Sequence, residues 1–208
     1  MEFNGACLMS ILLLFSSVGI IYASDSDILT DFTVPAGQNP LNLTGNFFTF
    51  TGFRGLPNNN LTGQTAVKIT KGVMAEFPAL NGLGVSMAVL QFPAGGVNPP
   101  HTHPRASELL YLVDGCLLVG VVDTTGKLFT QTLTKGDLFV FPKGLLHYQL
   151  NTDNEAGAMA VSAFGSANAG TVSLPSTLFT SGITDDVLAK SFKTNTPTIE
   201  LLKAALKP

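Results

Sequence analysis

Short apolar runs alternate with turn-forming residues through the middle of the chain. Each run is rich in Val, Leu and Phe, and Gly, Pro or Asp separates it from the next. Runs of this length and spacing are typical of the strands of a β-sandwich or barrel. The sequence therefore predicts an all-β domain with strands at Ala66–Ile69, Val85–Phe92, Leu109–Val113, Leu117–Val122, Leu128–Leu133, Leu138–Phe141, Tyr148–Asn151 and Ala158–Phe164.

The two ends of the chain follow other patterns. Residues 24–63 are rich in Gly, Asn, Pro and Thr and predict an extended N-terminal arm, whereas residues 64–175 carry the predicted strands. In residues 176–208, two segments begin with Ser, Thr or Asp and continue with apolar residues at helical spacing. We therefore predict C-terminal helices at Thr184–Phe192 and Thr198–Leu206.

The composition agrees with one folded domain. The 208 residues are 45% hydrophobic and 12% charged, which is enough apolar material for a sizeable core. The formal net charge is −3 and the sequence pI is about 5.5, and no stripe of Lys and Arg interrupts this balance. These properties argue against a nucleic-acid-binding protein.

An apolar segment at residues 6–21 precedes Tyr22 and Ala23. It is shorter than the roughly 20 apolar residues that a membrane-spanning helix needs. We therefore predict a signal peptide, residues 1–23, cut after Ala23, although no Lys or Arg precedes the apolar segment. A retained membrane anchor is the alternative. Cleavage would give a secreted protein with no membrane span in the mature chain.

Glycosylation sites and cysteines add to this expectation. Asn42 and Asn60 each begin an Asn-Leu-Thr sequon in polar sequence, and Asn60 is the better candidate for N-glycosylation because its surroundings are more loop-like. Cys7 would leave with the signal peptide, so only Cys116 would remain and no intrachain disulfide is expected. A buried, unreactive thiol is the default interpretation of Cys116, and a bond between chains is the alternative.

All three histidines of the chain lie in two short motifs. The first contains His101 and His103, followed by Glu108, and the second contains His147 after a turn built from Pro142 and Gly144. Residues two apart on a strand point to the same face, so His101 and His103 can reach one ion. Pro104 can turn the chain so that a neighbouring strand brings Glu108 inward. The pattern predicts a metal site of three imidazoles and one carboxylate.

These motifs resemble those of the cupins, G-x5-H-x-H-x4-E-x6-G and G-x5-P-x-G-x2-H-x3-N. The chain has every fixed position of both, from Gly95 to Gly115 and from Gly136 to Asn151. The short spacing between the motifs and the segments around the histidines are similar to those of plant germin-like proteins. The resemblance extends from about Asp27 to the C-terminus.

The resemblance implies a jelly-roll barrel, and it implies that His101, His103, Glu108 and His147 bind manganese, as Mn2+. It also implies a protein of the plant apoplast or cell wall, assembled through its C-terminal segment into a hexamer that is a trimer of dimers. Most germins carry an N-terminal cysteine pair, but Thr33 stands near the first of these positions, so that disulfide is expected to be missing. A cupin that keeps the motif without binding metal is the alternative.

Imidazole and carboxylate ligands suit Mn, Fe, Ni, Cu or Zn, so the choice of manganese rests on the resemblance. Four protein ligands would leave two positions open on an ion that favours six. One hypothesis is an extracellular manganese superoxide dismutase. The other is a non-catalytic protein: a binder of a small carboxylate such as an auxin, a receptor-like surface protein, or a storage-type cupin.

Three further residues bear on the chemistry. Asn98 is a candidate catalytic residue beside the metal, although Asn98-Pro-Pro could equally be a turn, and Arg105 either helps to attract anions or is simply solvated. In true germins, two asparagines are thought to orient oxalate beside the metal. One corresponds to Asn98 and the other falls at Ala88. The resemblance therefore implies weak or no oxalate oxidase activity, because a methyl group donates no hydrogen bond.

Overall fold

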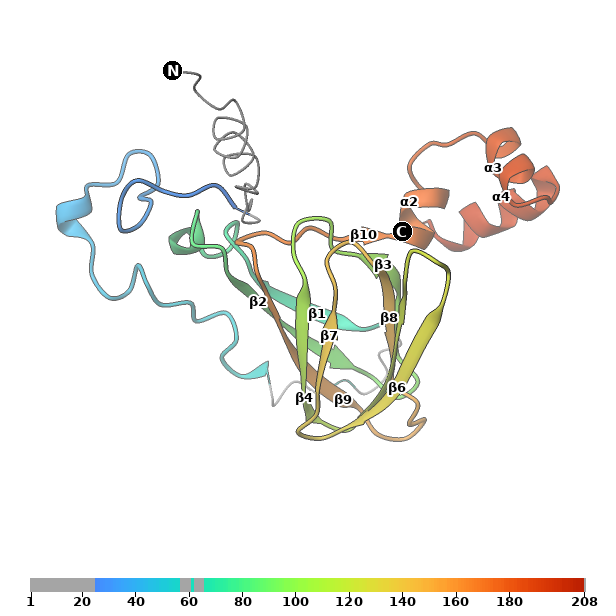
Figure 1. Ribbon diagram of the computed structural model, residues 1–208, viewed down its shortest axis with the longest axis horizontal. Coiled ribbons are helices and arrows are strands. Elements are labelled where there is room, and N and C mark those ends of the chain that lie inside the picture. The colour runs from blue at the N-terminus through green and yellow to red at the C-terminus, as the bar shows by residue number, and fades with distance from the viewer. Residues whose placement is uncertain (1–24, 57–60, 62–65, 208) are drawn as a thin grey trace, which may run out of the picture.

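The computed structural model describes residues 25–56, 61 and 66–207. Within them, two five-stranded antiparallel sheets lie face to face and form a barrel (Figure 1), which confirms the predicted all-β jelly roll. The strand orders are β1-β2-β9-β4-β7 and β10-β3-β8-β5-β6. The strands are β1 (Lys68–Gly72), β2 (Ser86–Phe92), β3 (Val97–Thr102), β4 (Glu108–Asp114), β5 (Cys116–Val122), β6 (Leu128–Thr134), β7 (Leu138–Phe141), β8 (Leu146–Leu150), β9 (Ala158–Phe164) and β10 (Val172–Ser173).

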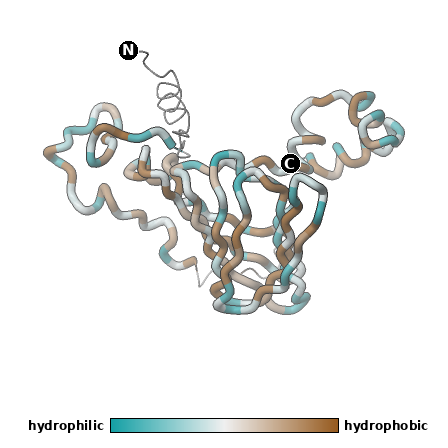
Figure 2. The backbone as a smooth tube through the Cα atoms, viewed as in Figure 1, coloured by the Kyte–Doolittle hydropathy of each residue, from teal (hydrophilic) through white to brown (hydrophobic). Residues whose placement is uncertain are grey.

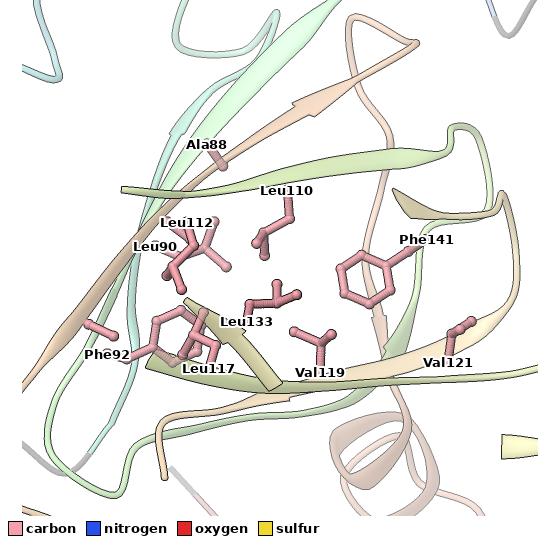
Figure 3. Close-up of a cluster of buried hydrophobic side chains, with 12 residues drawn as sticks. Ala88, Leu90, Phe92, Leu110, Leu112, Leu117, Val119, Val121, Leu133 and Phe141 are labelled. Atoms are coloured by element: carbon pink, nitrogen blue, oxygen red, sulfur yellow. The ribbon is translucent and has the colours of Figure 1, made fainter. Parts of the chain in front are cut away.

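One apolar core fills the space between the sheets. Buried positions alternate with less buried ones along β4 and β8, as expected of strands with one face turned inward. Hydrophobic and hydrophilic residues are accordingly interleaved around the barrel (Figure 2). Side chains from both sheets meet in the interior (Figure 3), and the largest fully buried ones include Phe92, Leu110, Leu112, Leu117, Val119 and Phe141.

Two strands lie outside the predicted runs. β10 has only two residues. β3 contains Pro99 and Pro100, which lack a backbone N–H and therefore argue against a strand in a sequence pattern. The pairing of β3 with β8 shifts register between Asn98 and His101, so the prolines are accommodated by an irregularity in the ladder.

Three helices follow the barrel: α2 (Leu174–Phe179), α3 (Asp185–Ser191) and α4 (Thr196–Ala205). α3 and α4 confirm the predicted C-terminal helices, whereas α2 was not predicted. α4 starts two residues earlier than expected because Asn195 caps it, accepting a hydrogen bond of 3.0 Å from the Thr198 N–H, and Pro197 stands in the first turn. The helices project to one side of the barrel (Figure 1), and Leu188, Ala189 and Ile199 form their own small core.

The N-terminal arm extends away from the barrel on the side opposite the helices and returns to it near its end (Figure 1). It contains the 3-10 turn η1 (Pro40–Asn42), where Asn42 is exposed. The arm meets the barrel where Phe50 stacks against Phe77, next to the 3-10 turn η3 (Pro78–Leu80), with ring centroids 5.6 Å apart. The predicted signal peptide and Asn60 lie outside the described residues. No helix in the described part of the chain is long and apolar enough to cross a membrane.

The outer face of the sheet β1-β2-β9-β4-β7 carries an exposed apolar surface. Cross-strand partners bring its members together, because Leu109 pairs with Val140 and Tyr111 with Leu138. Each of these side chains is between 42% and 60% exposed, and Met87 on β2 is 41% exposed. We call this set, Met87, Leu109, Tyr111, Leu138 and Val140, the apolar outer face.

Candidate metal centre

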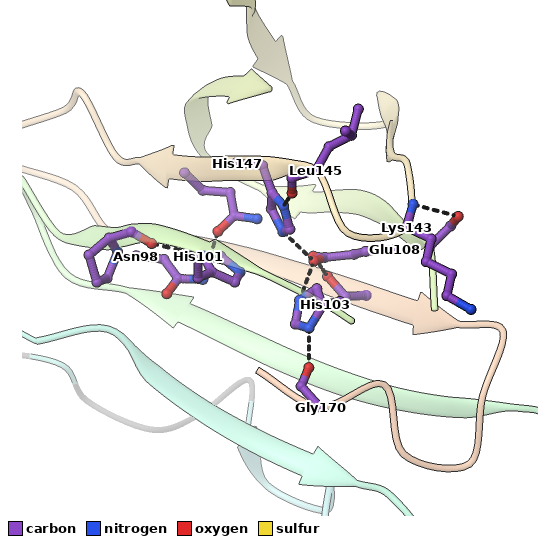
Figure 4. Close-up of polar contacts among 12 residues, drawn as sticks. Asn98, His101, His103, Glu108, Lys143, Leu145, His147 and Gly170 are labelled. Atoms are coloured by element: carbon purple, nitrogen blue, oxygen red, sulfur yellow. Dashed lines mark hydrogen bonds and ion pairs between the residues drawn. The ribbon is translucent and has the colours of Figure 1, made fainter. Parts of the chain in front are cut away.

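Both sheets contribute to the predicted metal site. His101 on β3 pairs directly with His147 on β8, and His103 follows just after β3 ends. Glu108 is the first residue of β4 in the opposite sheet, reached after the chain turns at Pro104. The structure thus brings all four predicted residues together inside one end of the barrel, where their side chains point toward one another (Figure 4).

The distances suit a single ion. One ligand atom from each of the four residues lies within 4.8 Å of the others. Glu108 Oε2 is 2.9 Å from His103 Nε2 and 3.3 Å from His147 Nε2. Neighbouring ligands of an ion with bonds of about 2.1 Å are separated by about 3 Å, so little movement is needed to bind one. All four side chains are buried.

Backbone carbonyls determine which nitrogen of each ring faces the site. The Nδ1 atom of His101 lies 2.8 Å from the Pro99 oxygen, and that of His147 lies 2.8 Å from the Leu145 oxygen. His103 Nδ1 lies 2.5 Å from the Gly170 oxygen. These acceptors favour a proton on Nδ1, which leaves the Nε2 lone pair free for a metal. The Nε2 atoms of His103 and His147 both face Glu108 Oε2, so a cation bound there would take the place of any proton held between them.

The electrostatics of the site agree with ligands in their metal-binding forms. Burial, together with the neighbouring His147, lowers the pKa of His101 to about 4, so its ring is neutral at neutral pH. Burial alone would raise the pKa of Glu108, but the contacts with His103 and His147 outweigh it and lower that pKa to about 2. Ser162 on β9 also donates a hydrogen bond of 2.6 Å to Glu108 Oε1. Neutral imidazoles and an ionised carboxylate are the forms that bind metal.

The apolar core supports these side chains from below. The His147 ring stacks on Phe141, with centroids 4.4 Å apart and an interplanar angle of 20°. The rings of His103 and Phe164 pack edge to face, with centroids 4.9 Å apart. Because Phe141 is also part of the barrel core, the packing that stabilises the fold also fixes the direction of a candidate ligand.

A cavity of about 330 Å³ opens beside the candidate ligands. Its walls are mainly apolar where Leu90 and Phe164 line it, and Lys71 and Glu76 add charged groups. Lys71 is the cross-strand partner of Ala88, which also lines the cavity and is 4% exposed. The methyl group of Ala88 therefore lies on the same face as the Lys71 side chain, at the position where the resemblance places an asparagine in true germins.

Asn98 lies in β3 and lines the same cavity. Its Nδ2 donates a hydrogen bond of 2.7 Å to Oε1 of Gln149, the residue opposite it on β8. Gln149 is fully buried, and its Nε2 has no hydrogen-bond partner within the described residues. The sequence analysis did not identify Gln149 or Ser162. Each lies two residues from a buried residue of its own strand, His147 on β8 and Ala160 on β9, and therefore on the same inward face.

Comparison with known proteins first defines the class of this fold and site. The cupin family model matches residues 57–200. Germin-like protein 9-3 of Oryza sativa subsp. japonica is 58% identical over 200 residues, covering 92% of this chain and 90% of the relative. The chain belongs to the germin-like proteins of the cupin family.

Solved structures of oxalate oxidase are similar over most of the chain. One has a TM-score of 0.78 and 34% identity, and covers 87% of this chain and 97% of the other. A second, an oxalate oxidase in complex with the substrate analogue glycolate, has a TM-score of 0.78 and 33% identity, with the same coverage. These likenesses confirm the barrel architecture around the candidate site.

Proposed function

We propose that this chain is a secreted, manganese-binding germin-like protein of the apoplast or cell wall with superoxide dismutase-type activity. The observation that carries the proposal is the buried group of His101, His103, Glu108 and His147 beside a cavity of about 330 Å³. Three imidazole nitrogens and one carboxylate fit manganese, and the cavity gives a small substrate access to the same place.

Bound manganese would supply a centre that gains and loses one electron, which dismutation of superoxide requires. The protein itself would hold the ion, exclude bulk water and admit an anion. The rings of Phe141 and Phe164 keep two imidazoles in place. Of the two charged side chains on the cavity wall outside the ligand set, the Lys71 ammonium attracts anions and the Glu76 carboxylate opposes it. Asn98 is our candidate for orienting a bound oxygen species, because its amide lies on the cavity wall and Gln149 holds it.

The same cavity supports weak or no oxalate oxidation. Oxalate has two carboxylates to orient, and Ala88 offers no hydrogen bond on its part of the wall. Superoxide is smaller and needs only the metal and a source of protons. The oxalate oxidase activity of the structural relatives is therefore not carried over to this chain.

Turnover per bound metal tests the proposal. The native secreted protein should contain close to one manganese per subunit by elemental analysis, and it should remove superoxide faster than the same amount of free manganese. The His101→Ala variant should lose both properties. A metal-replete protein that removes superoxide no faster than free manganese would overturn the enzymatic assignment.

A binding function is the second candidate, because the cavity wall includes Ile69, Leu90 and Phe164. Such a wall can hold the ring of an aromatic acid while its carboxylate faces the metal. Saturable binding of an auxin-like acid to the loaded protein, without turnover of superoxide, would support this alternative.

We further propose that the protein is a glycosylated hexamer, a trimer of dimers. The apolar outer face supports self-association, because five large apolar side chains stand exposed on one sheet. The projecting helices α2, α3 and α4 offer a second contact surface (Figure 1). Asn42 is exposed and open to glycosylation, and Asn60 is the other candidate. Light scattering of the purified protein, before and after glycosidase treatment, tests both statements.

A further inference from the structure

The segment between β9 and β10, residues 165–171, forms one wall of the cavity and reaches a candidate metal ligand. Asn168, Ala169, Gly170 and Thr171 line the cavity. The Gly170 oxygen is the acceptor for His103 Nδ1. Whatever holds this segment therefore also sets the direction of the His103 ring.

Arg105 holds it from one side. Its Nε donates to the Asn168 oxygen at 2.6 Å, and its Nη2 donates to Asn168 Oδ1 at 3.1 Å. The backbone N–H of Arg105 also donates to the Ala169 oxygen at 3.1 Å. Asn168 Oδ1 in turn accepts from the Gly170 N–H at 3.1 Å. The planar guanidinium thus makes a two-pronged contact that a lysine cannot reproduce.

Gly170 is adapted to this contact. Its φ of +70° is in the left-handed region, and a Cβ atom there would lie 2.6 Å from Arg105 Nη2. A larger residue would be strained and would push the guanidinium away from Asn168. Because Gly170 has no side chain, the Arg105 guanidinium can lie directly against it, next to the carbonyl that contacts His103.

The arm holds the other side of the segment. The Asp25 carboxylate accepts from Ser166 Oγ at 2.5 Å and from the Ala167 N–H at 2.7 Å. Ser86 Oγ on β2 donates to the Ser166 oxygen at 2.6 Å. Asp25 and Ser86 thus fix the start of the segment, the Met74 N–H donates to the Ala167 oxygen at 2.9 Å, and Arg105 contacts the residues that follow.

We propose that Arg105 is a positioning residue for the candidate metal ligand His103. Through Asn168 and Gly170 it fixes the carbonyl that keeps the proton on His103 Nδ1 and turns Nε2 toward the ion. The Arg105 side chain is exposed, but its contacts with Asn168 give it a structural role beyond that of a solvated residue. The inference rests on metal binding by the four residues of the proposed function, but not on any turnover.

Chelator competition and electron paramagnetic resonance on manganese-loaded protein test this role. Outer contacts of metal-ligating histidines commonly change affinity by about 10- to 100-fold. Arg105 acts one contact further out, so Arg105→Met should release Mn2+ roughly 10-fold faster and broaden the Mn2+ spectrum. Arg105→Lys keeps the charge without the planar fork and should resemble Arg105→Met. Gly170→Ala should act in the same direction by displacing the guanidinium.

Arg54→Met, an exposed arginine on the arm, is the matched control and should release Mn2+ as the unmodified protein does. Thermal melting of the metal-free variants separates loss of the fold from loss of the ligand geometry. If Arg105→Met is unstable, Arg105→Lys and Gly170→Ala decide the question. The inference would be overturned if these variants released Mn2+ at rates within two-fold of the unmodified protein and gave Mn2+ spectra of unchanged line width. It would also be overturned if the unmodified protein bound no Mn2+. A protein that binds Mn2+ but does not dismutate superoxide would contradict only the proposed enzyme activity.

Discussion

Replacing Ala88 with asparagine should raise the activity of the manganese-loaded protein toward oxalate. Ala88 lies on β2 between its cross-strand partners Lys71 and Ser162, with its methyl group against the cavity. An asparagine there would direct its amide inward, toward the space beside His101 and His103 that the cavity already provides. The change adds a hydrogen-bond donor without altering the residues that would hold the metal.

The size of the effect follows from the new hydrogen bond. A bond to a charged group contributes about 1.5–3 kcal/mol, which corresponds to about a 10- to 150-fold gain in kcat/KM for oxalate. In the empty protein, the new amide would be buried without a partner, at a cost of about 1–3 kcal/mol. Ala88→Asn should therefore melt at a lower temperature than the unmodified protein, and oxalate should restore most of the loss.

The assay compares two activities on one manganese-loaded preparation. Hydrogen peroxide production from oxalate should rise in Ala88→Asn, while superoxide removal per bound manganese should change little. Ala88→Leu is the matched control, because leucine has nearly the shape of asparagine but donates no hydrogen bond. Efficient oxalate oxidation by the unmodified protein would refute the reasoning, and so would an equal gain in Ala88→Leu.

Three further predictions concern the metal, pH and covalent state. His101→Ala or His147→Ala should remove most bound manganese while far-UV circular dichroism stays that of a β protein, because each deletes a candidate ligand but little of the core; full manganese content would contradict the assignment. In metal-free protein, His101 has a pKa of about 4 in the fold against 6.5 in the unfolded chain, so the unfolded chain binds more protons between these values. The unfolding free energy should then fall by about 3 kcal/mol as the pH drops through this range, and His101→Gln should remove most of that dependence in urea titrations. On non-reducing gels the secreted protein should show no intrachain disulfide, since Cys116 alone would survive processing, and a bridge mapped by mass spectrometry would argue against cleavage after Ala23.

The sequence was most informative where periodicity and chemistry coincide. The apolar runs of the barrel strands were enough to predict an all-β sandwich or barrel, and the two-residue spacing placed His101 and His103 near one another. The jelly roll came from the resemblance to the cupins. Glu108 shows the limit of such reasoning. Its sequence position gives the wrong parity for one strand, and only the structure shows that it enters from the opposite sheet.

Other parts of the site left no readable signal in the sequence. The acceptors for the histidine Nδ1 atoms are backbone carbonyls, which every residue carries, so no residue type marks Pro99, Leu145 or Gly170 for that role. Arg105 had two plausible interpretations because its partner Asn168 is 63 residues away. Contacts between residues so far apart in the sequence form only when the barrel folds, and local sequence patterns do not predict them.

The two prolines of β3 limit the pairing of this strand with strands of other molecules. β3 lies near the end of its sheet, and β10 covers it only at His101 and Thr102. An uncovered edge of this kind can recruit a strand from another molecule and start aggregation. Pro99 and Pro100 have no N–H with which to bind such a strand. The prolines that made β3 hard to delimit in the sequence therefore also protect the outer edge of this histidine-bearing strand from pairing with a strand of another molecule.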